Sequence, residues 1–289
     1  VINCEHDYLT GISVYFKTGG ILKMKKLLKI TSLVLAIAIA AFCFAGCGNN
    51  KTDEKTETKT SNEETTNDSS DTLKMATNAA FPPYESKEGD KFVGIDVEIA
   101  QAIADDLGKK LEICDMEFDS IITSVDKGEA DFAMAGLTVT DERKKEVDFT
   151  SSYATGVQVV IVKADSAYTT PDDLKGKKIG VQLGTTGDAY AADDYGDENV
   201  IRYSKGADAV IALKGGDVDA VIIDNEPAKA FVAENEGLKI LDTEYVIEDY
   251  AIAVKKGNTE LLDSINKSLE KLTSNGKIDE IIAKYIKAE

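Results

Sequence analysis

The chain has 289 residues, of which 43% are hydrophobic, and it carries a formal net charge of −19. So acidic a surface repels phosphate backbones, which argues against nucleic-acid binding. Its one histidine, His6, lies in a segment that we expect to be absent from the mature protein, so we expect no His-containing nucleophile system and no His-bound metal, and any chemistry would have to come from carboxylates, Lys, Tyr or a thiol. We expect no cofactor and no enzymatic activity.

The first 72 residues predict a targeting signal followed by a flexible tether. A basic start at Met24–Lys29, a short apolar run and an Ala-Gly-Cys end are typical of a signal peptide, so we expect residues 24–46 to be removed. Phe-Ala-Gly-Cys resembles the bacterial lipobox, with Phe replacing the usual Leu, and predicts a lipidated Cys47 as the first mature residue; an ordinary secretory signal is the alternative. Residues 1–23 precede this complete signal and are interpreted as an untranslated upstream extension. Residues 47–72 lack large apolar side chains beyond the cysteine and predict a disordered tether.

Beyond residue 72, short apolar strands alternate with helices. The first series comprises predicted strands at Leu73–Thr77, Leu111–Met116 and Asp131–Ala135 and predicted helices at Val97–Leu107 and Ser120–Lys127. Asp96 and Asp119 are the predicted N-caps of these two helices. Gly108 and Gly128 follow the two helices and can end them.

A second series repeats this alternation. It comprises predicted strands at Val157–Val162, Lys178–Gln182, Val218–Ile223, Leu238–Leu241 and Tyr250–Val254, a helical turn at Pro171–Leu174, and helices at about 226–234, 260–273 and 278–287. The β-α-β order predicts parallel sheets covered by helices, and two such series predict two lobes. Ligands bind beyond the carboxyl ends of strands in such sheets, so the segments that follow the strands are where binding residues are expected.

Two of these segments belong to the first series. After Thr77, two prolines keep the chain extended and present Asn78 and Phe81 on a loop, although an aromatic residue on a loop more often serves packing. After the strand that ends at residue 135, Gly136 permits close approach of a ligand and Thr138 offers a hydroxyl group. Arg143, in a short helix that we expect Asp141 to cap, could hold a carboxylate bidentately.

The other two segments belong to the second series. Gly-Thr-Thr-Gly at residues 184–187 opens a helix near Asp188, and its free N–H groups suit an anion; no Lys-Ser/Thr ending follows, so it is not a nucleotide-binding P-loop. Asp224 ends a wholly apolar strand, where an ammonium group would satisfy its charge. One guanidinium, two turns rich in N–H groups and one carboxylate together predict a receptor for a zwitterion.

In this order, these residues resemble the amino-acid-binding solute receptors of bacterial ABC importers, over about Leu73 to Tyr285. The likeness is most specific at Ala135–Lys145 and Val147–Tyr153. It implies the type II periplasmic-binding-protein fold, an α/β fold of two lobes joined by a two-strand hinge near Tyr153–Val157 and Val246–Tyr250. The implied lobes are lobe 1, residues 73–154 with 249–289, and lobe 2, residues 155–248 with the hinge strands.

The resemblance also implies the roles of individual residues. Arg143, helped by threonines of both lobes, would hold the ligand α-carboxylate; Asp224 and Gly136 would hold the α-ammonium, between the rings of Phe81 and Phe118. The predicted ligand-binding residues are Asn78, Phe81, Glu85, Phe118, Ala135, Gly136, Thr138, Arg143, Gln182, Thr185, Thr186 and Asp224. The implied partners are a free L-amino acid and the transporter's membrane subunits, with the receptor a lipid-anchored monomer on the outer face of a Gram-positive cytoplasmic membrane.

Selectivity and function leave alternatives open at this point. Several relatives have Asp at the position of Asn78, so Asn78 weakens the case for a basic ligand, whereas Glu85 keeps one possible; Gln182 is a further candidate selector. We expect a polar uncharged ligand such as glutamine. The alternatives are a dehydratase on the same fold, with Glu85 or Lys163 as acid or base, and a surface sensor that feeds no transporter.

Overall fold

The computed structural model describes residues 71–242 and 245–287. The predicted upstream extension, signal peptide, Cys47 and nearly all of the tether lie outside these residues. The tether prediction extends one residue too far, because Thr72 already belongs to the first strand. Within the two described ranges, no helix is both long enough and apolar enough to cross a membrane.

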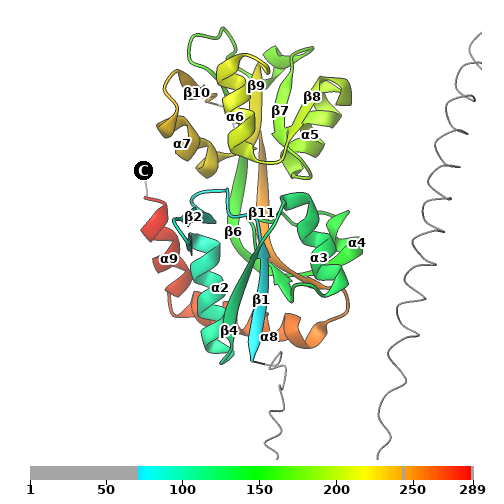
Figure 1. Ribbon diagram of the computed structural model, residues 1–289, viewed down its shortest axis with the longest axis vertical. Coiled ribbons are helices and arrows are strands. Elements are labelled where there is room, and N and C mark those ends of the chain that lie inside the picture. The colour runs from blue at the N-terminus through cyan, green and yellow to red at the C-terminus, as the bar shows by residue number, and fades with distance from the viewer. Residues whose placement is uncertain (1–70, 243–244, 288–289) are drawn as a thin grey trace, which may run out of the picture. The chain divides into compact units, whose positions relative to one another are not determined.

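Strands and helices alternate as predicted through most of the chain (Figure 1). The strands are β1 (Thr72–Thr77), β2 (Ser86–Glu88), β3 (Lys91–Val93), β4 (Lys110–Asp115), β5 (Phe132–Ala133), β6 (Val147–Lys163), β7 (Ile179–Gln182), β8 (Val200–Tyr203), β9 (Ala220–Asp224), β10 (Leu238–Ile240) and β11 (Val246–Lys255). The helices are α2 (Ile95–Asp106), α3 (Ile121–Lys127), α4 (Arg143–Glu146), α5 (Thr186–Tyr195), α6 (Gly206–Gly215), α7 (Asn225–Glu234), α8 (Thr259–Ser274) and α9 (Lys277–Tyr285). Short 3₁₀ turns are η1 (Phe118–Ser120), η2 (Pro171–Leu174) and η3 (Asp197–Asn199).

Nine of the described strands form one curled sheet in the order β4-β1-β5-β11-β6-β9-β7-β8, with β10 paired to β6, and β2 and β3 form a separate two-stranded sheet. Strand β1 is parallel to β4 and β5, and β7 is parallel to β8 and β9. Strands β6 and β11 are antiparallel to each other and lie between these two parallel sets. The structure therefore confirms the predicted α/β fold of two lobes joined by two strands.

The two connecting strands run through both lobes (Figure 1). The first half of β6 packs against β11 and α8, whereas its second half pairs with β9 and β10. The apolar pattern alone predicted only the second half, Val157–Val162, because polar residues interrupt the first half, and the resemblance added a hinge strand near Tyr153–Val157. For the same reason the predicted strand Tyr250–Val254 is only part of β11.

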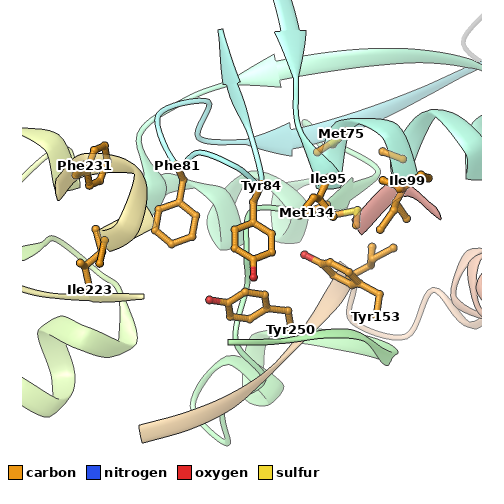
Figure 2. Packing of buried hydrophobic residues seen from close by; sticks show 14 of the residues in the cluster. Met75, Phe81, Tyr84, Ile95, Ile99, Met134, Tyr153, Ile223, Phe231 and Tyr250 are labelled. Carbon is orange, nitrogen blue, oxygen red and sulfur yellow. The ribbon is translucent and has the colours of Figure 1, made fainter. Parts of the chain in front are cut away.

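Each lobe buries side chains on both faces of its sheet. In lobe 1, helices α2, α8 and α9 cover one face, and α3 covers the other, where Ile121 and Leu137 are fully buried. Figure 2 shows Ile99 and Met134 on the first face, close to Tyr153. Each such buried apolar side chain contributes roughly 1.5–3 kcal/mol of transfer free energy. The core therefore fixes where the strands end, and with them the loops that follow.

Three predicted helix caps are wrong. Helix α2 starts after Gly94, while Asp96 is buried within its first turn, where its carboxylate accepts the Gly136 N–H at 2.8 Å. Asp119 lies inside η1 instead of capping α3. At α4 the N–H of Arg143 donates to the Thr140 hydroxyl at 3.1 Å, and Asp141 forms an exposed ion pair instead. The carboxylates of Asp96 and Asp141 are engaged by other partners, Gly136 and Lys144, so neither caps its helix.

Candidate functional site

One cavity of about 310 Å³ lies between the lobes, at the carboxyl ends of β1, β5, β7 and β9. All twelve residues that the sequence predicted for the site line it. Lobe 1 supplies Asn78, Phe81, Glu85, Phe118, Ala135, Gly136, Thr138 and Arg143, and lobe 2 supplies Gln182, Thr185, Thr186 and Asp224. The fold thus brings together side chains from five stretches of the chain.

Arg143 is held by contacts on several sides. Its Nη1 donates to the Thr138 carbonyl at 2.8 Å, and its Nη2 donates to the Gly184 carbonyl of the other lobe at 3.2 Å. The guanidinium carbon lies 5.5 Å from the centroid of the Phe118 ring, within range of a cation–π interaction. Burial lowers the pKa of Arg143, and the charges of Glu248 and Asp224 oppose that shift. An arginine remains cationic under such conditions, so the cavity contains a fixed positive charge.

Asp224 supplies the opposite charge from lobe 2. Its side chain is 8% exposed, and the Tyr250 hydroxyl donates to one of its oxygens. The pKa of Asp224 is raised to about 7, chiefly by burial; the bond from Tyr250 lowers this pKa, and the charge of Glu248 contributes to the rise. Asp224 and Arg143 line the same cavity, so a small zwitterion could meet one matched charge at each end.

Aromatic rings close the lobe 1 side. The rings of Phe81 and Tyr84 stack with centroids 5.9 Å apart, and Tyr84 meets Tyr250 edge-to-face at 5.2 Å (Figure 2). Gly136 lies against this stack with φ +52°, and a Cβ there would come within 2.9 Å of Phe81 Cε1. A larger residue at position 136 would displace the ring that lines the cavity.

The start of α5 offers fewer free groups than its sequence suggested. The Thr185 hydroxyl caps the helix, accepting the Asp188 N–H at 3.2 Å and donating to the Gln182 carbonyl at 2.8 Å. It is therefore already engaged. Among the described residues, none forms a hydrogen bond with the Thr186 hydroxyl, which also lines the cavity. The helix starts at Thr186, two residues before the predicted position.

A further part of the cavity lining contains the residues that we expect to determine which ligand side chain is accepted. The Asn78 amide donates to the Met116 carbonyl at 2.7 Å and accepts from the Gln182 amide at 2.9 Å, which joins the two lobes. Glu85 is fully buried, and within the described part of the chain neither carboxyl oxygen has a hydrogen-bond partner of good geometry. Burial, and next the charge of Asp96, raise the pKa of Glu85 well above its usual value. A carboxyl group that is kept neutral beside the buried carboxylate of Asp96 therefore lines the cavity.

Glu248 is the site-adjacent residue that the sequence did not reveal. This 5% exposed carboxylate on β11 accepts from the Thr138 hydroxyl at 3.2 Å, the Gln158 amide at 3.0 Å and the Tyr190 hydroxyl at 3.0 Å. Glu248 therefore engages the hydroxyl proton of Thr138 in a hydrogen bond, and its bonds connect the loop that contains Thr138 in lobe 1 to helix α5 in lobe 2. In the sequence, Glu248 looks like one of two consecutive acidic residues on a solvated strand edge.

Replacing Glu248 with alanine should lower the free energy of unfolding by about 2–4 kcal/mol, because it leaves three donors without their shared acceptor. Urea denaturation of the ligand-free protein measures this. Glu112→Ala is the matched control: Glu112 is an exposed glutamate on strand β4, and its loss should change stability by less than about 0.5 kcal/mol. Equal effects of the two substitutions would show that the bonds to Glu248 contribute nothing.

Lys163, one of the two acid–base candidates, lies elsewhere. It lines a separate groove of lobe 2 of about 720 Å³, together with Tyr168 and Asp219. The cavity between the lobes includes Glu85 but not Lys163. The structure therefore removes Lys163 from any chemistry in that cavity.

Comparisons with known proteins agree with this geometry. Residues 73–288 match the family model of bacterial extracellular solute-binding proteins, family 3. The arginine-binding extracellular protein ArtP of Bacillus subtilis is 34% identical over 89% of this chain and 98% of its own length. A solved ancestral arginine-binding protein bound to arginine is 43% identical, with a TM-score of 0.71 over 75% of this chain and 98% of that one. An ancestral arginine-binding protein bound to glutamine is 42% identical, with a TM-score of 0.70 over 75% and 99%.

Proposed function

The chain belongs to the bacterial extracellular solute-binding proteins, family 3, and we propose that it captures one free L-amino acid between its lobes for delivery to the membrane subunits of an ABC importer. Its relatives are named as amino-acid-binding proteins, which supports a receptor over an enzyme. The observation that carries the proposal is the pair formed by Arg143 and Asp224. They come from different lobes, carry opposite charges and line one cavity.

Each end of the ligand has a chemically matched partner. Arg143 would hold the α-carboxylate, with the Thr186 hydroxyl and the N–H groups at the start of α5 beside it. Asp224 would hold the α-ammonium. Because each charged end must exchange water for protein partners, the ligand is held well only when both lobes contact it, which couples binding to hinge closure.

The side chain of the ligand would lie toward Glu85, and we propose a polar uncharged amino acid such as glutamine. The raised pKa keeps Glu85 neutral in the empty cavity, where its carbonyl oxygen could accept a hydrogen bond from the amide of a ligand while its proton is directed at Asp96. A cationic side chain would first have to ionise this buried group. The solved relatives bound to arginine and to glutamine make these two amino acids the ligands to compare.

A thermal-shift screen of the purified protein against the twenty amino acids tests this function. A ligand present at a hundred times its dissociation constant should stabilise the protein by about 2.7 kcal/mol, which raises the melting temperature by several degrees. Glutamine should give the largest shift. Absence of a shift with every amino acid would refute the proposal, and loss of uptake in a deletion strain would distinguish transport from sensing.

Glu85→Gln should separate the two ligands. The substitution keeps the shape and removes the ability to ionise, so we expect glutamine affinity to change less than tenfold and arginine affinity to fall about a hundredfold, which is roughly 2.7 kcal/mol. Titration calorimetry with both ligands measures this. Glu88→Gln, in the exposed hairpin that follows, is the matched control and should change neither affinity. Equal losses for both ligands would show that Glu85 does not select between them.

We also propose that a lipid on Cys47 anchors the receptor to the outer face of the cytoplasmic membrane and that the receptor acts as a monomer. The signal-like sequence before Cys47 supports the anchor, and the completeness of the cavity within a single chain supports the monomer. The mass of the membrane-extracted mature protein would test the lipid, and light scattering of the soluble domain would test the monomer.

A further inference from the structure

Gly184 lies where the two lobes approach each other beside Arg143. It follows β7 in lobe 2 with φ +78°. A Cβ on Gly184 would lie 3.1 Å from Asp119 Cβ and 3.3 Å from Asp119 Cα, and Asp119 belongs to η1 of lobe 1. Both separations are shorter than ordinary van der Waals contacts, so either Asp119 or the turn at Gly184 would have to shift by a few tenths of an ångström to accommodate a Cβ there.

The same residue is bonded to both lobes. Its carbonyl accepts the Arg143 Nη2 at 3.2 Å from lobe 1, and its N–H donates to Asp188 Oδ2 at 3.1 Å within lobe 2. Asp188 is in turn fixed by Arg202, whose Nε lies 2.8 Å from Asp188 Oδ1. The bonds to Asp188 and Arg202 therefore restrain the turn within lobe 2, and it has little freedom to move away from Asp119.

We propose that Gly184 is a positioning residue for ligand capture: the missing side chain lets the lobes close far enough for Arg143 to meet the Gly184 carbonyl. This inference rests on the proposed closure around an amino acid. A methyl group at position 184 would keep the lobes apart on the side where Arg143 lies. The ligand would still enter, but it would leave sooner because the closed state is incomplete.

Gly184→Ala also strains the backbone, since φ near +78° disfavours any residue with a Cβ. Gly176→Ala is the matched control, because Gly176 lies in the same lobe at φ +72° and an added Cβ there meets no atom within 4 Å. Both substitutions should lower the urea midpoint of the ligand-free protein to a similar extent. Only Gly184→Ala should weaken binding of L-glutamine and L-arginine, by tenfold or more, mainly through faster dissociation in stopped-flow measurements.

Scattering and a compensating substitution complete the test. With saturating ligand, small-angle X-ray scattering should show a smaller compaction for Gly184→Ala than for the wild type and Gly176→Ala. Adding Asp119→Gly should restore part of the lost affinity, because it removes the atom nearest to the new methyl group. If Gly184→Ala proves too unstable to purify, Gly184→Ser with Asp119→Gly replaces it and should bind more tightly than Gly184→Ser alone.

Two failures would be distinguishable. If the wild type binds none of the amino acids, the proposed function fails. If the wild type and Gly176→Ala bind normally and Gly184→Ala binds equally well, or if Asp119→Gly restores nothing, the role of Gly184 is wrong while the receptor function stands.

Discussion

Replacing Arg143 with alanine should weaken amino-acid binding by about a thousandfold while leaving the ligand-free fold intact. Truncating one partner of a buried, hydrogen-bonded charge pair typically costs 2–5 kcal/mol, and about 4 kcal/mol corresponds to that factor. The loss should be large because the ligand carboxylate would enter a cavity that also contains Asp224, with no cation left to balance it. Titration calorimetry of the purified variant measures the effect.

The fold should tolerate the loss of Arg143. Among the residues that the structure describes, the guanidinium donates only to the carbonyl oxygens of Thr138 and Gly184, and the removal of a buried cation partly offsets the loss of those bonds. We therefore expect the melting temperature of the ligand-free variant to fall by no more than a few degrees. An unfolded variant would contradict this expectation.

Two further variants locate the effect. Arg143→Lys keeps the charge but loses the planar fork, so affinity should fall by about ten- to a hundredfold instead of a thousandfold. Lys145→Ala changes an exposed cation of the same short helix and should leave affinity unchanged. Unimpaired binding by Arg143→Ala would remove Arg143 from the site and with it the proposed recognition of a carboxylate.

Much of the candidate site could be predicted because its residues follow strands. The carboxyl ends of parallel strands meet at one edge of a sheet, so segments far apart in the chain, such as those at Asn78 and Asp224, were expected to face one ligand. Their local sequence also indicated their chemistry, because it showed a carboxylate at the end of a strand, an arginine after a glycine turn, and N–H groups at the start of a helix. The cavity contains all of them.

What the sequence could not predict depends on distant partners. Asp96 had the local pattern of a helix cap, but it is buried and bonded to Gly136, 40 residues away, and to Tyr153, 57 residues away. Glu248 looked like a solvated charge, yet its partners Thr138 and Tyr190 lie 110 and 58 residues away. Hydrophobic periodicity reports the face on which a residue lies, and it contains no information about which donor a buried carboxylate will meet.

Affinity for glutamine should fall about tenfold for each pH unit below 7 and stay constant above it. The pKa of Asp224 in the empty cavity is about 7, because burial disfavours its charged form. The ligand ammonium needs the carboxylate, so at low pH each binding event must release a proton from Asp224. The direction is the same as for a site with an ordinary aspartate, but the loss begins near pH 7, whereas an ordinary aspartate would keep the affinity constant down to about pH 4.

The groups that face Asp224 determine whether the pH dependence of affinity reports the ionisation of Asp224 alone. Glu248 is the neighbouring acid, and Tyr250 donates a hydrogen bond to Asp224. Glu85 has a pKa well above its usual value and stays neutral with an uncharged ligand, so glutamine is a better probe than arginine, which would ionise Glu85 as well. Calorimetry in two buffers of different ionisation enthalpy counts the protons released at each pH.

Asp224→Asn isolates the residue responsible. An amide cannot ionise, so this variant should bind about a hundredfold more weakly at pH 8 and show an almost constant affinity between pH 5 and pH 8. At pH 5 the wild type should have lost most of its advantage over the variant, because it then carries a neutral side chain at this position too. A wild-type affinity that does not change from pH 5 to pH 8, or a variant that keeps the full pH dependence, would show that the ammonium of the ligand does not meet Asp224.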